Sequence, residues 1–398
     1  MRRSSRRNSG ESSAVPKVVL LLESSRASGR ALLCGVASYA HHHGPWSFFW
    51  EPAGLEKAWP LLRTLDADGL ILRDVENVDE VLASGIPAVV VGHSRTEIPG
   101  LVNVVTDSQT IGRMAAEHLL NAGFRVFGYC GMAYSDTERT PWSQQRGESF
   151  SRRIAEAGFE THFYRFPAAR EELSGSADRL HMARWLESLP KPAGIMACND
   201  DRGQQVIEAC RLARLNVPDQ VAVIGVDNNE LICGLSDPPM SSVAVNFERA
   251  GYESAEILDQ MMRGRRARGI KILVRATHVV ARRSTDIVAV DDPHLASALR
   301  FIRDHSRGLV SVPDVARAAG LSRRVLEKRF KQVLKRSALQ EIRRARVATI
   351  GSMLVETNQT IAQIALALGF TSEEHIARYF RREKNMTPLA YRRLYGRK

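Results

Sequence analysis

Short apolar runs alternate with longer amphipathic segments over most of the chain before residue 284. The apolar runs predict strands at 18–22, 47–50, 69–72, 88–91, 102–105, 125–129, 161–166, 194–197 and 221–226. The segments between them predict helices that include 30–42, 110–122, 148–157, 177–188 and 204–213. Such alternation is typical of a parallel, doubly wound sheet. Because about 265 residues are too many for one sheet of this kind, we expect two α/β lobes.

A different pattern occupies the last quarter of the chain, where one unit occurs twice. Residues 312–320 match 361–369 at an offset of 49, and residues 321–330 match 371–380 at an offset of 50. In each copy, apolar positions at helical spacing lead to a glycine, a short turn and a second apolar-faced segment. The extra residue falls in the second turn, where it disturbs neither helix. Each copy is therefore predicted to form two helices joined by a tight turn.

Capping residues support this prediction. The first helix of each copy begins with a capping pair and is followed by a glycine suited to left-handed backbone. These residues are Ser311, Asp314 and Gly320 in one copy and Thr360, Gln363 and Gly369 in the other. The second helix of each copy turns a polar face outward, made of Arg323, Arg324, Glu327, Lys328 and Lys331 or of Glu373, Glu374, His375, Arg378 and Arg381.

This arrangement predicts two helix-turn-helix units whose second helices enter the major groove of DNA. Arg323 and Arg324 lie in the first turn, where side chains reach base edges, and the remaining cations are suited to phosphates. A helical hairpin repeat with a basic, solvent-exposed face is the alternative. Between the copies, residues 339–356 predict one helix whose apolar side includes Arg346. A helix of that length spans about 25 Å, enough to hold both recognition helices on one face of DNA.

The distribution of charge agrees with a polyanionic partner. Residues 291–398 contain 22 Lys and Arg against 10 Asp and Glu, a net charge of +12 that equals the charge of the whole chain. Residues 1–290 are therefore neutral, and the basic character belongs to the helical repeat. A charge excess alone is often only a solvated surface.

Other features exclude several classes of protein. The five cysteines form no C-x-x-C pair, which indicates reduced thiols, and no 18-residue apolar run is present to span a membrane. The basic N-terminus lacks the apolar core of a secretory signal, so residues 1–16 predict a disordered arm and the chain is expected in the bacterial cytoplasm, at the nucleoid. His41, His42 and His43 have no acidic or cysteine partner nearby, so no metal or cofactor is expected. No nucleophile–base pair stands out in the sequence, so an enzyme is not expected.

Polar side chains follow the predicted strands at the edge where doubly wound sheets bind ligands. The candidate ligand-binding residues, suited to hydroxyl groups or to stacking on a sugar face, are Arg26, Asp107, Trp142, Arg146, Asp200, Arg202 and Asp227. His93 also follows a strand. Asp107 and Asp200 have a second interpretation, because each can cap the helix that begins after it.

Two resemblances carry these expectations further. Residues 295–395 resemble the DNA-binding domain of the AraC/XylS family in Leu326-x-x-Arg-Phe330, in Arg346 with Leu354, in Ile364-Ala365-x-x-x-Gly369-Phe370 and in Thr387-Pro388-x-x-Tyr391-Arg392. The sequence departs from the family at Ile350, Ile376 and Asn385.

The region before it resembles the periplasmic-binding-protein-like sensor of LacI/GalR regulators in Arg146-Gly147, Asn199-Asp200, Val223-Ile-Gly-Val-Asp227 and Ser241-Ser-Val243. That resemblance implies that Arg146, Asp200 and Asp227 contact a sugar. It also implies that the chain crosses between lobes near Arg125, Met240 and Arg268.

The expected organisation is a disordered arm at 1–16, a sugar-sensing domain at 17–286, a linker at 287–294 and a DNA-binding domain at 295–398. The resemblances imply a transcription regulator, an activator that responds to a pentose such as xylose. Its expected partners are double-stranded DNA, the sugar, RNA polymerase and a second copy in a homodimer. A repressor of the same build that responds to a hexose or nucleoside is one alternative. A sugar-binding transport component is another, although it would need export.

Overall fold

The structure is a computed structural model that describes residues 15–52, 66–74, 79, 83–92, 97–132, 140–166, 175–286 and 292–396. The predicted arm before residue 15, most of the predicted linker and His93 lie outside the described residues. The chain forms two compact units. The first comprises residues up to 105 together with 250–273, and the second comprises 106–249 together with 274–398.

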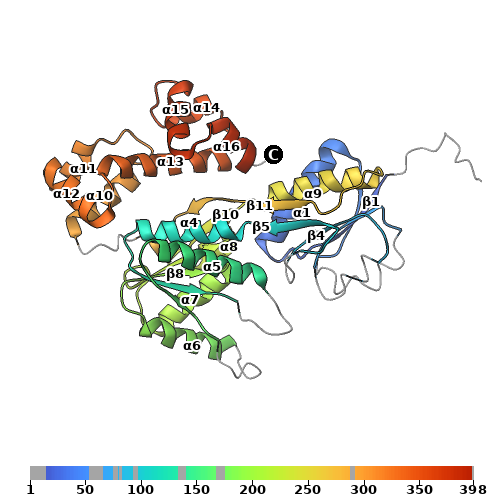
Figure 1. The fold of residues 1–398 in the computed structure, drawn as a ribbon, viewed down its shortest axis with the longest axis horizontal. Helices are drawn as coiled ribbons and strands as arrows, with labels where there is room; N and C mark the ends of the chain where they lie inside the picture. Colours follow the sequence, from blue (N-terminus) through green and yellow to red (C-terminus); the bar gives the residue numbers. More distant parts are fainter. Residues whose placement is uncertain are drawn as a thin grey trace, which may run out of the picture. The chain divides into compact units, whose positions relative to one another are not determined.

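The first unit contains a six-stranded sheet in the order β11-β5-β4-β3-β1-β2. Its strands are β1 (Lys17–Leu21), β2 (Ser47–Trp50), β3 (Gly69–Arg73), β4 (Ala88–Val91), β5 (Val102–Thr106) and β11 (Lys271–Val274). Helices α1 (Ala27–His43) and α9 (Phe247–Met262) pack together, and α9 also packs on β3 (Figure 1). Gly251 permits the close approach of these helices, because a Cβ there would lie 2.0 Å from the carbonyl oxygen of Leu32.

The sheet of the second unit has the order β12-β10-β9-β8-β6-β7. Its strands are β6 (Val126–Cys130), β7 (Thr161–Phe163), β8 (Ala193–Ala197), β9 (Val221–Val226), β10 (Ser241–Val245) and β12 (Ala276–Val280). Pairing is parallel from β7 to β10, and β12 is antiparallel to β10. The strand order reverses beside β6, and ligands of doubly wound sheets bind at the carboxyl ends of strands near such a reversal.

Helices cover both faces of this second sheet (Figure 1). They are α4 (Ser108–Asn121), α5 (Pro141–Glu156), α6 (Gly175–Ser188), α7 (Asp200–Leu212) and the short α8 (Glu230–Leu235). Met196 of β8 joins a core with Ile111 and Phe150 from α4 and α5, whereas Ile195 joins a core with Met182 and other residues of α6 and α7. Successive residues of one strand thus enter opposite cores, as the twofold period of a strand requires.

Seven helices form the C-terminal domain of the second unit, among the described residues: α10 (Pro293–Asp304), α11 (Val312–Ala318), α12 (Arg323–Leu334), α13 (Ala338–Glu356), α14 (Ile361–Ala367), α15 (Glu373–Lys384) and α16 (Pro388–Tyr395). They build two separate cores. Phe330 and Ile342 belong to one, and Ile350 and Phe380 belong to the other, so α13 contributes to both. Helix α13 lies between the two helical groups (Figure 1).

The predicted fold class, two α/β lobes and a helical domain with two helix-turn-helix units, is confirmed. The chain passes between units at 105/106, 249/250 and 273/274, so the crossing predicted near Arg125 is wrong, whereas those predicted near Met240 and Arg268 lie nine and five residues before the observed ones. Helix α4 already packs in the core of the second unit through Ile111 and Leu119, so the first crossing precedes it and does not fall near Arg125. Among the described helices, none is long and apolar enough to cross a bilayer.

Candidate ligand site and nucleic-acid interface

The predicted caps of both helix-turn-helix units are present. Ser311 and Asp314 form a reciprocal capping box at α11, and Thr360 and Gln363 form the corresponding box at α14. The turns then use left-handed backbone at the predicted glycines, with φ of 64° at Gly320 and 70° at Gly369. Because each cap satisfies backbone donors at a helix start, the sequence itself fixes where these helices begin.

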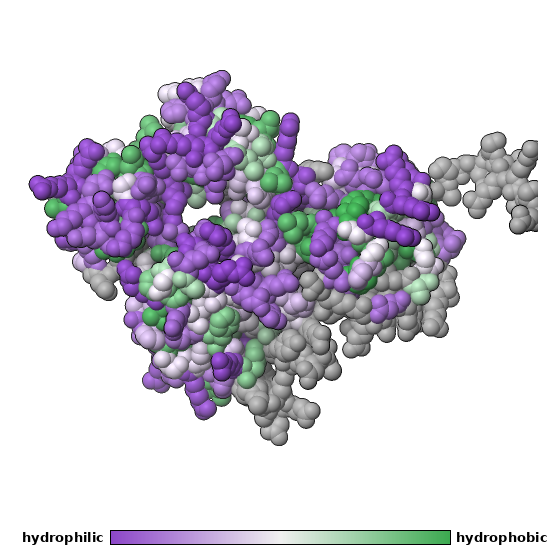
Figure 2. All heavy atoms as spheres, in the orientation of Figure 1, coloured by the Kyte–Doolittle hydropathy of each residue, from purple (hydrophilic) through white to green (hydrophobic). Residues whose placement is uncertain are grey.

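The two second helices, α12 and α15, separate an apolar side from a polar side. Leu326 and Phe330 of α12, like Ile376 and Phe380 of α15, are completely buried. The predicted contact residues that are exposed are Arg323, Arg324, Lys328 and Lys331 on α12 and Glu373, Glu374, His375, Arg378 and Arg381 on α15. Hydrophilic side chains cover much of the helical domain in the space-filling view (Figure 2). Both helices therefore present the polar face that base and phosphate contacts need.

Glu327 differs from the other predicted contact residues of α12. Its side chain is half-buried, and its Oε2 accepts a hydrogen bond from the backbone N–H of Ala338 at 3.3 Å. A carboxylate at this position stabilises the start of α13, because unpaired N–H groups and the helix dipole at a helix N-terminus attract negative charge. Glu327 thus connects α12 to the start of α13.

Arg346 connects α13 to the second helix-turn-helix unit. It is 7% exposed, and its Nη2 donates to the carbonyl of Leu368 at 2.5 Å. The guanidinium carbon lies 4.3 Å from the ring centroid of Phe370 and 5.8 Å from that of Tyr379. Burial lowers the pKa of Arg346. The side chain ties the spacer helix to the end of α14 and to α15.

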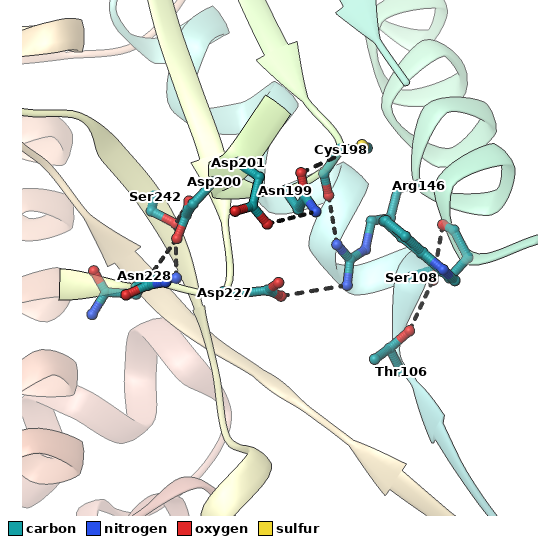
Figure 3. Close-up of polar contacts among 12 residues, drawn as sticks. Thr106, Ser108, Arg146, Cys198, Asn199, Asp200, Asp201, Asp227, Asn228 and Ser242 are labelled. Carbon is teal, nitrogen blue, oxygen red and sulfur yellow. Dashed lines mark hydrogen bonds and ion pairs between the residues drawn. The ribbon is translucent and has the colours of Figure 1, made fainter. Parts of the chain in front are cut away.

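A second polar cluster lies at the carboxyl ends of β6, β8 and β9, and Arg146 of α5 is at its centre (Figure 3). Arg146 is 2% exposed, and its Nη1 donates to the carbonyl of Cys198 at 2.5 Å. Its Nη2 lies 3.6 Å from Oδ1 of Asp227, and the guanidinium carbon lies 4.8 Å from the ring centroid of Trp142. The buried Nε of Arg146 has no hydrogen-bond partner in the described part of the chain. A buried guanidinium with a spare donor is expensive unless something accepts from it.

Backbone strain accompanies this cluster. Asp227 has a φ of 98°, in the region that favours glycine, and Asn228 follows with a φ of 51°. Such a conformation costs about 1–3 kcal/mol and persists where the surroundings enforce it, commonly at ligand sites. The turn after β9 is held by neighbours, because Ser242 accepts from the backbone of Asn228 at 3.0 Å and Arg282 donates to its side chain at 2.8 Å.

Asp200 supports this turn through hydrogen bonds. It is 2% exposed, and its two carboxylate oxygens accept from the Ser242 hydroxyl and from the backbone N–H of Asn229, each at 2.6 Å (Figure 3). Burial, with the nearby charge of Asp227, raises the pKa of Asp200 to about 8. Asp200 therefore faces protein groups on both oxygens and positions the Asp227 turn. Sequence reasoning missed the roles of Ser242, which lies in the Ser241-Ser-Val243 stretch, and of Asn229, which is two residues after Asp227.

The remaining predicted ligand residues lie in other local networks. Asp107 caps α4 by accepting from the N–H of Thr110 at 3.1 Å, which is its second interpretation. Arg202 forms a 2.7 Å ion pair with Asp178, and hydrogen bonds from Arg202 and Tyr164 lower the pKa of Asp178 although burial opposes this. Arg26 belongs to the first unit, where its Nε lies 4.0 Å from Glu23. The structure thus brings together Trp142, Arg146 and Asp227, and Asp200 holds the turn that carries Asp227.

Comparisons with known proteins cover both domains. Residues 116–285 match the family model of a periplasmic binding protein-like domain, and residues 315–394 match that of a helix-turn-helix domain. The chain is 30% identical over 386 residues to the xylose operon regulatory protein of Escherichia coli strain K12, covering 94% of this chain and 96% of that protein. It is 26% identical to the protein of the same name from Haemophilus influenzae, covering 94% and 98%.

A solved structure described as a xylose-binding transcription activator is also similar. It has a TM-score of 0.59 and 28% identity, with 96% of this chain and 98% of that chain covered. The similarity therefore includes the sensor, the DNA-binding domain and their order. The chain belongs to the family of the xylose operon regulatory proteins, transcription regulators that join a periplasmic-binding-protein-like sensor to an AraC-type helix-turn-helix domain.

Proposed function

We propose that this regulator activates transcription when a pentose, in the first place xylose, occupies the cluster around Arg146. The observation that carries the proposal is the buried Arg146 guanidinium, which is held by the carbonyl of Cys198 and by Asp227 and whose Nε has no hydrogen-bond partner among the described residues. The names of the similar proteins, which refer to xylose, support this class of effector.

The chemistry of the cluster suits a polyol. A guanidinium donates and a carboxylate accepts, so Arg146 and Asp227 together match vicinal hydroxyl groups, each of which donates and accepts. The Trp142 ring suits the apolar C–H face of a sugar. In this proposal Asp200 acts indirectly, because Ser242 and Asn229 engage both of its oxygens and it holds the strained turn that presents Asp227.

The DNA-binding part of the proposal assigns different contacts to the two recognition helices. Arg323 and Arg324 of α12 read base edges, because they are exposed in its first turn. Lys328, Lys331, Arg378 and Arg381 bind phosphates. Glu373 and Glu374 weaken the hold of α15 on the backbone, so α12 supplies most of the affinity. The active species is a cytoplasmic homodimer that recruits RNA polymerase at promoters.

Calorimetric titration of the full-length protein tests the effector. D-xylose should bind, whereas hexoses and nucleosides should bind more weakly or not at all. Arg146→Met and Asp227→Asn should each weaken D-xylose binding about 10- to 150-fold, the effect of losing a hydrogen bond to a charged group. Asn at 227 tolerates positive φ, so this variant keeps the turn.

A control variant comes from the same helix. Arg153 of α5 lies in surface ion pairs with Glu117 and Glu156, so Arg153→Met should bind D-xylose as the wild type does. Wild-type affinity in both Arg146→Met and Asp227→Asn contradicts the site. Preferential binding of a hexose or nucleoside replaces the proposed effector.

A further inference from the structure

Helix α16, the last helix of the DNA-binding domain, is attached to the sensor lobe of its own unit by two polar contacts. The buried Tyr391 hydroxyl donates to the carbonyl of Thr277 in β12 at 3.0 Å. The side-chain amide of Asn246 donates to the carbonyls of Tyr395 and Gly396 at 2.7 and 3.3 Å. These carbonyls lie at the C-terminal end of α16, where backbone acceptors lack partners within the helix.

Both attachment points lie close to places where the chain passes between the two units. Asn246 follows β10, and its Oδ1 caps α9 by accepting from the N–H of Arg249 at 3.0 Å, directly before the crossing at 249/250. Thr277 lies in β12, three residues after the chain returns at 273/274. The Thr277 hydroxyl also donates to the carbonyl of Ala244 at 3.2 Å, which joins β12 to β10. The two crossing segments are thus linked to each other and to α16.

On its other side, α16 contacts the parts of the domain that position a recognition helix. The Tyr391 ring packs edge-on against Phe380 of α15, with centroids 5.2 Å apart. Arg392 donates from Nε to the carbonyl of Leu354 in α13 at 3.0 Å. A displacement of α16 is therefore passed to α15 and to the spacer helix, because packed side chains do not deform continuously.

We propose that Asn246 and Tyr391 are the residues that couple sensor to DNA reading, by attaching α16 to the two crossing segments. This inference rests on the proposed function and adds to it that sugar binding changes the arrangement of the two lobes. Any such change must alter the backbone at the crossings, and Asn246 and Thr277 are fixed to those segments. The two contacts convert that alteration into a new orientation of α15.

Besides the pairs of His278 with Glu356 and of Arg303 with Asp286, a further contact between the sensor and the helical domain provides a control. Arg336, in the turn between α12 and α13, donates to Oδ1 of Asn121 at 3.2 Å. Asn121 ends α4 and is distant in sequence from every crossing. Loss of this bond weakens the attachment of the domain without touching a crossing segment, so it separates coupling from simple docking.

The test uses Asn246→Asp, Tyr391→Phe and Asn121→Ala in the full-length protein. Asp at 246 keeps the acceptor that caps α9 but removes the donor to α16, and Phe at 391 keeps the ring packing but removes the hydroxyl. The DNA probe is the duplex that the wild-type protein selects from a random-sequence library, and the sugar probe is D-xylose. The measured quantity is the ratio of DNA dissociation constants without and with D-xylose.

In Asn246→Asp and Tyr391→Phe, the ratio should move about fivefold toward one, the fold-change of one net hydrogen bond. D-xylose affinity should remain within about twofold of wild type, since neither residue touches the Arg146 cluster. Amide hydrogen exchange of α16 should be about fivefold faster without any ligand. Asn121→Ala should keep the wild-type ratio.

A wild-type ratio in Asn246→Asp and Tyr391→Phe overturns the coupling, as does an equal loss in Asn121→Ala. If D-xylose leaves the DNA affinity of the wild type unchanged, the proposed function fails instead. The attachment is then judged by exchange alone, and unaltered α16 exchange in Asn246→Asp refutes it.

Discussion

Replacing Arg346 with methionine tests how the second helix-turn-helix unit is held to the spacer helix. Methionine fills a similar length of apolar space but removes the charge and the hydrogen bond to Leu368. It also removes the cation from the face of Phe370, 4.3 Å away. The carbonyl of Leu368 then lies at the end of α14 without this donor.

The expected loss follows from these two contacts. A buried hydrogen bond from a charged donor contributes about 1.5–3 kcal/mol. A cation over an aromatic face adds about 0.5–1 kcal/mol. The local free energy of unfolding of α14 and α15 should therefore fall by about 2–4 kcal/mol, which corresponds to amide exchange about 30- to 900-fold faster. Helices α11 and α12 belong to a separate core and should keep their exchange rates.

Hydrogen–deuterium exchange with peptide resolution measures this difference in the full-length protein, and α11 and α12 serve as the internal reference. Arg344→Met is the control, because the Arg344 side chain is 44% exposed and forms a 3.4 Å ion pair with Glu341. When that pair is lost, Glu341 is still paired with Arg336. An exposed pair contributes at most about 1 kcal/mol. If Arg346→Met changes the amide exchange rates of α14 and α15 by less than about fourfold, Arg346 does not hold the second helix-turn-helix unit to α13.

Three further predictions concern the DNA interface, the ligand cluster and a helix cap. Arg323→Ala should cost about 1–3 kcal/mol of DNA affinity and relax preference at one base step, measured by binding to a library of single-base variants; uniform weakening would identify a phosphate contact instead. The pKa of Asp200 is raised to about 8 in the folded state, so the native protein holds a proton that the unfolded chain releases near pH 4. The free energy of unfolding should therefore fall as pH rises from about 4 to 8. Asp200→Asn should flatten that dependence in denaturant titrations, and an unchanged slope counts against the raised pKa. Ser311→Ala should destabilise α11 by about 1 kcal/mol with α14 unaffected, seen as faster exchange in α11 alone.

Local chemistry made the helical domain predictable from sequence. The capping residues Ser311 and Thr360 and the glycines at 320 and 369 act within a few residues of themselves, and each adopts the predicted role. Asn385 takes left-handed backbone with a φ of 54°, which explains why the departure from glycine is tolerated. Strands were equally legible, since the buried strands β4 and β9 and the mostly exposed edge strand β2 have the predicted bounds.

Elements that depend on distant partners could not be placed in the same way. Strand β11 pairs with the edge of the first sheet through the Ile270 carbonyl and the Asn103 N–H, and its short alternating segment has no independent signal. Helix α5 begins at Pro141 and not near residue 148, because proline suits the first helical turn while its following residues are polar.

The site shows the same limit. Asp200 and Arg202 were predicted as ligand contacts from their place after a strand. Their hydrogen bonds to Ser242 and Asp178 could not be predicted, because these partners lie 42 and 24 positions away in the sequence. Arg146 and Asp227 are adjacent only because α5 and β9 meet at one edge of the sheet.

The continuous helix α13, which enters both cores, limits how target sites can evolve. An insertion of one residue in α13 would turn the second recognition helix, α15, by about 100° and advance it by about 1.5 Å. Three added base pairs turn DNA by a similar angle, yet they lengthen it by about 10 Å. No change in operator length compensates both. The interval between the two half-elements of each target is therefore expected to stay constant while the bases within them diverge.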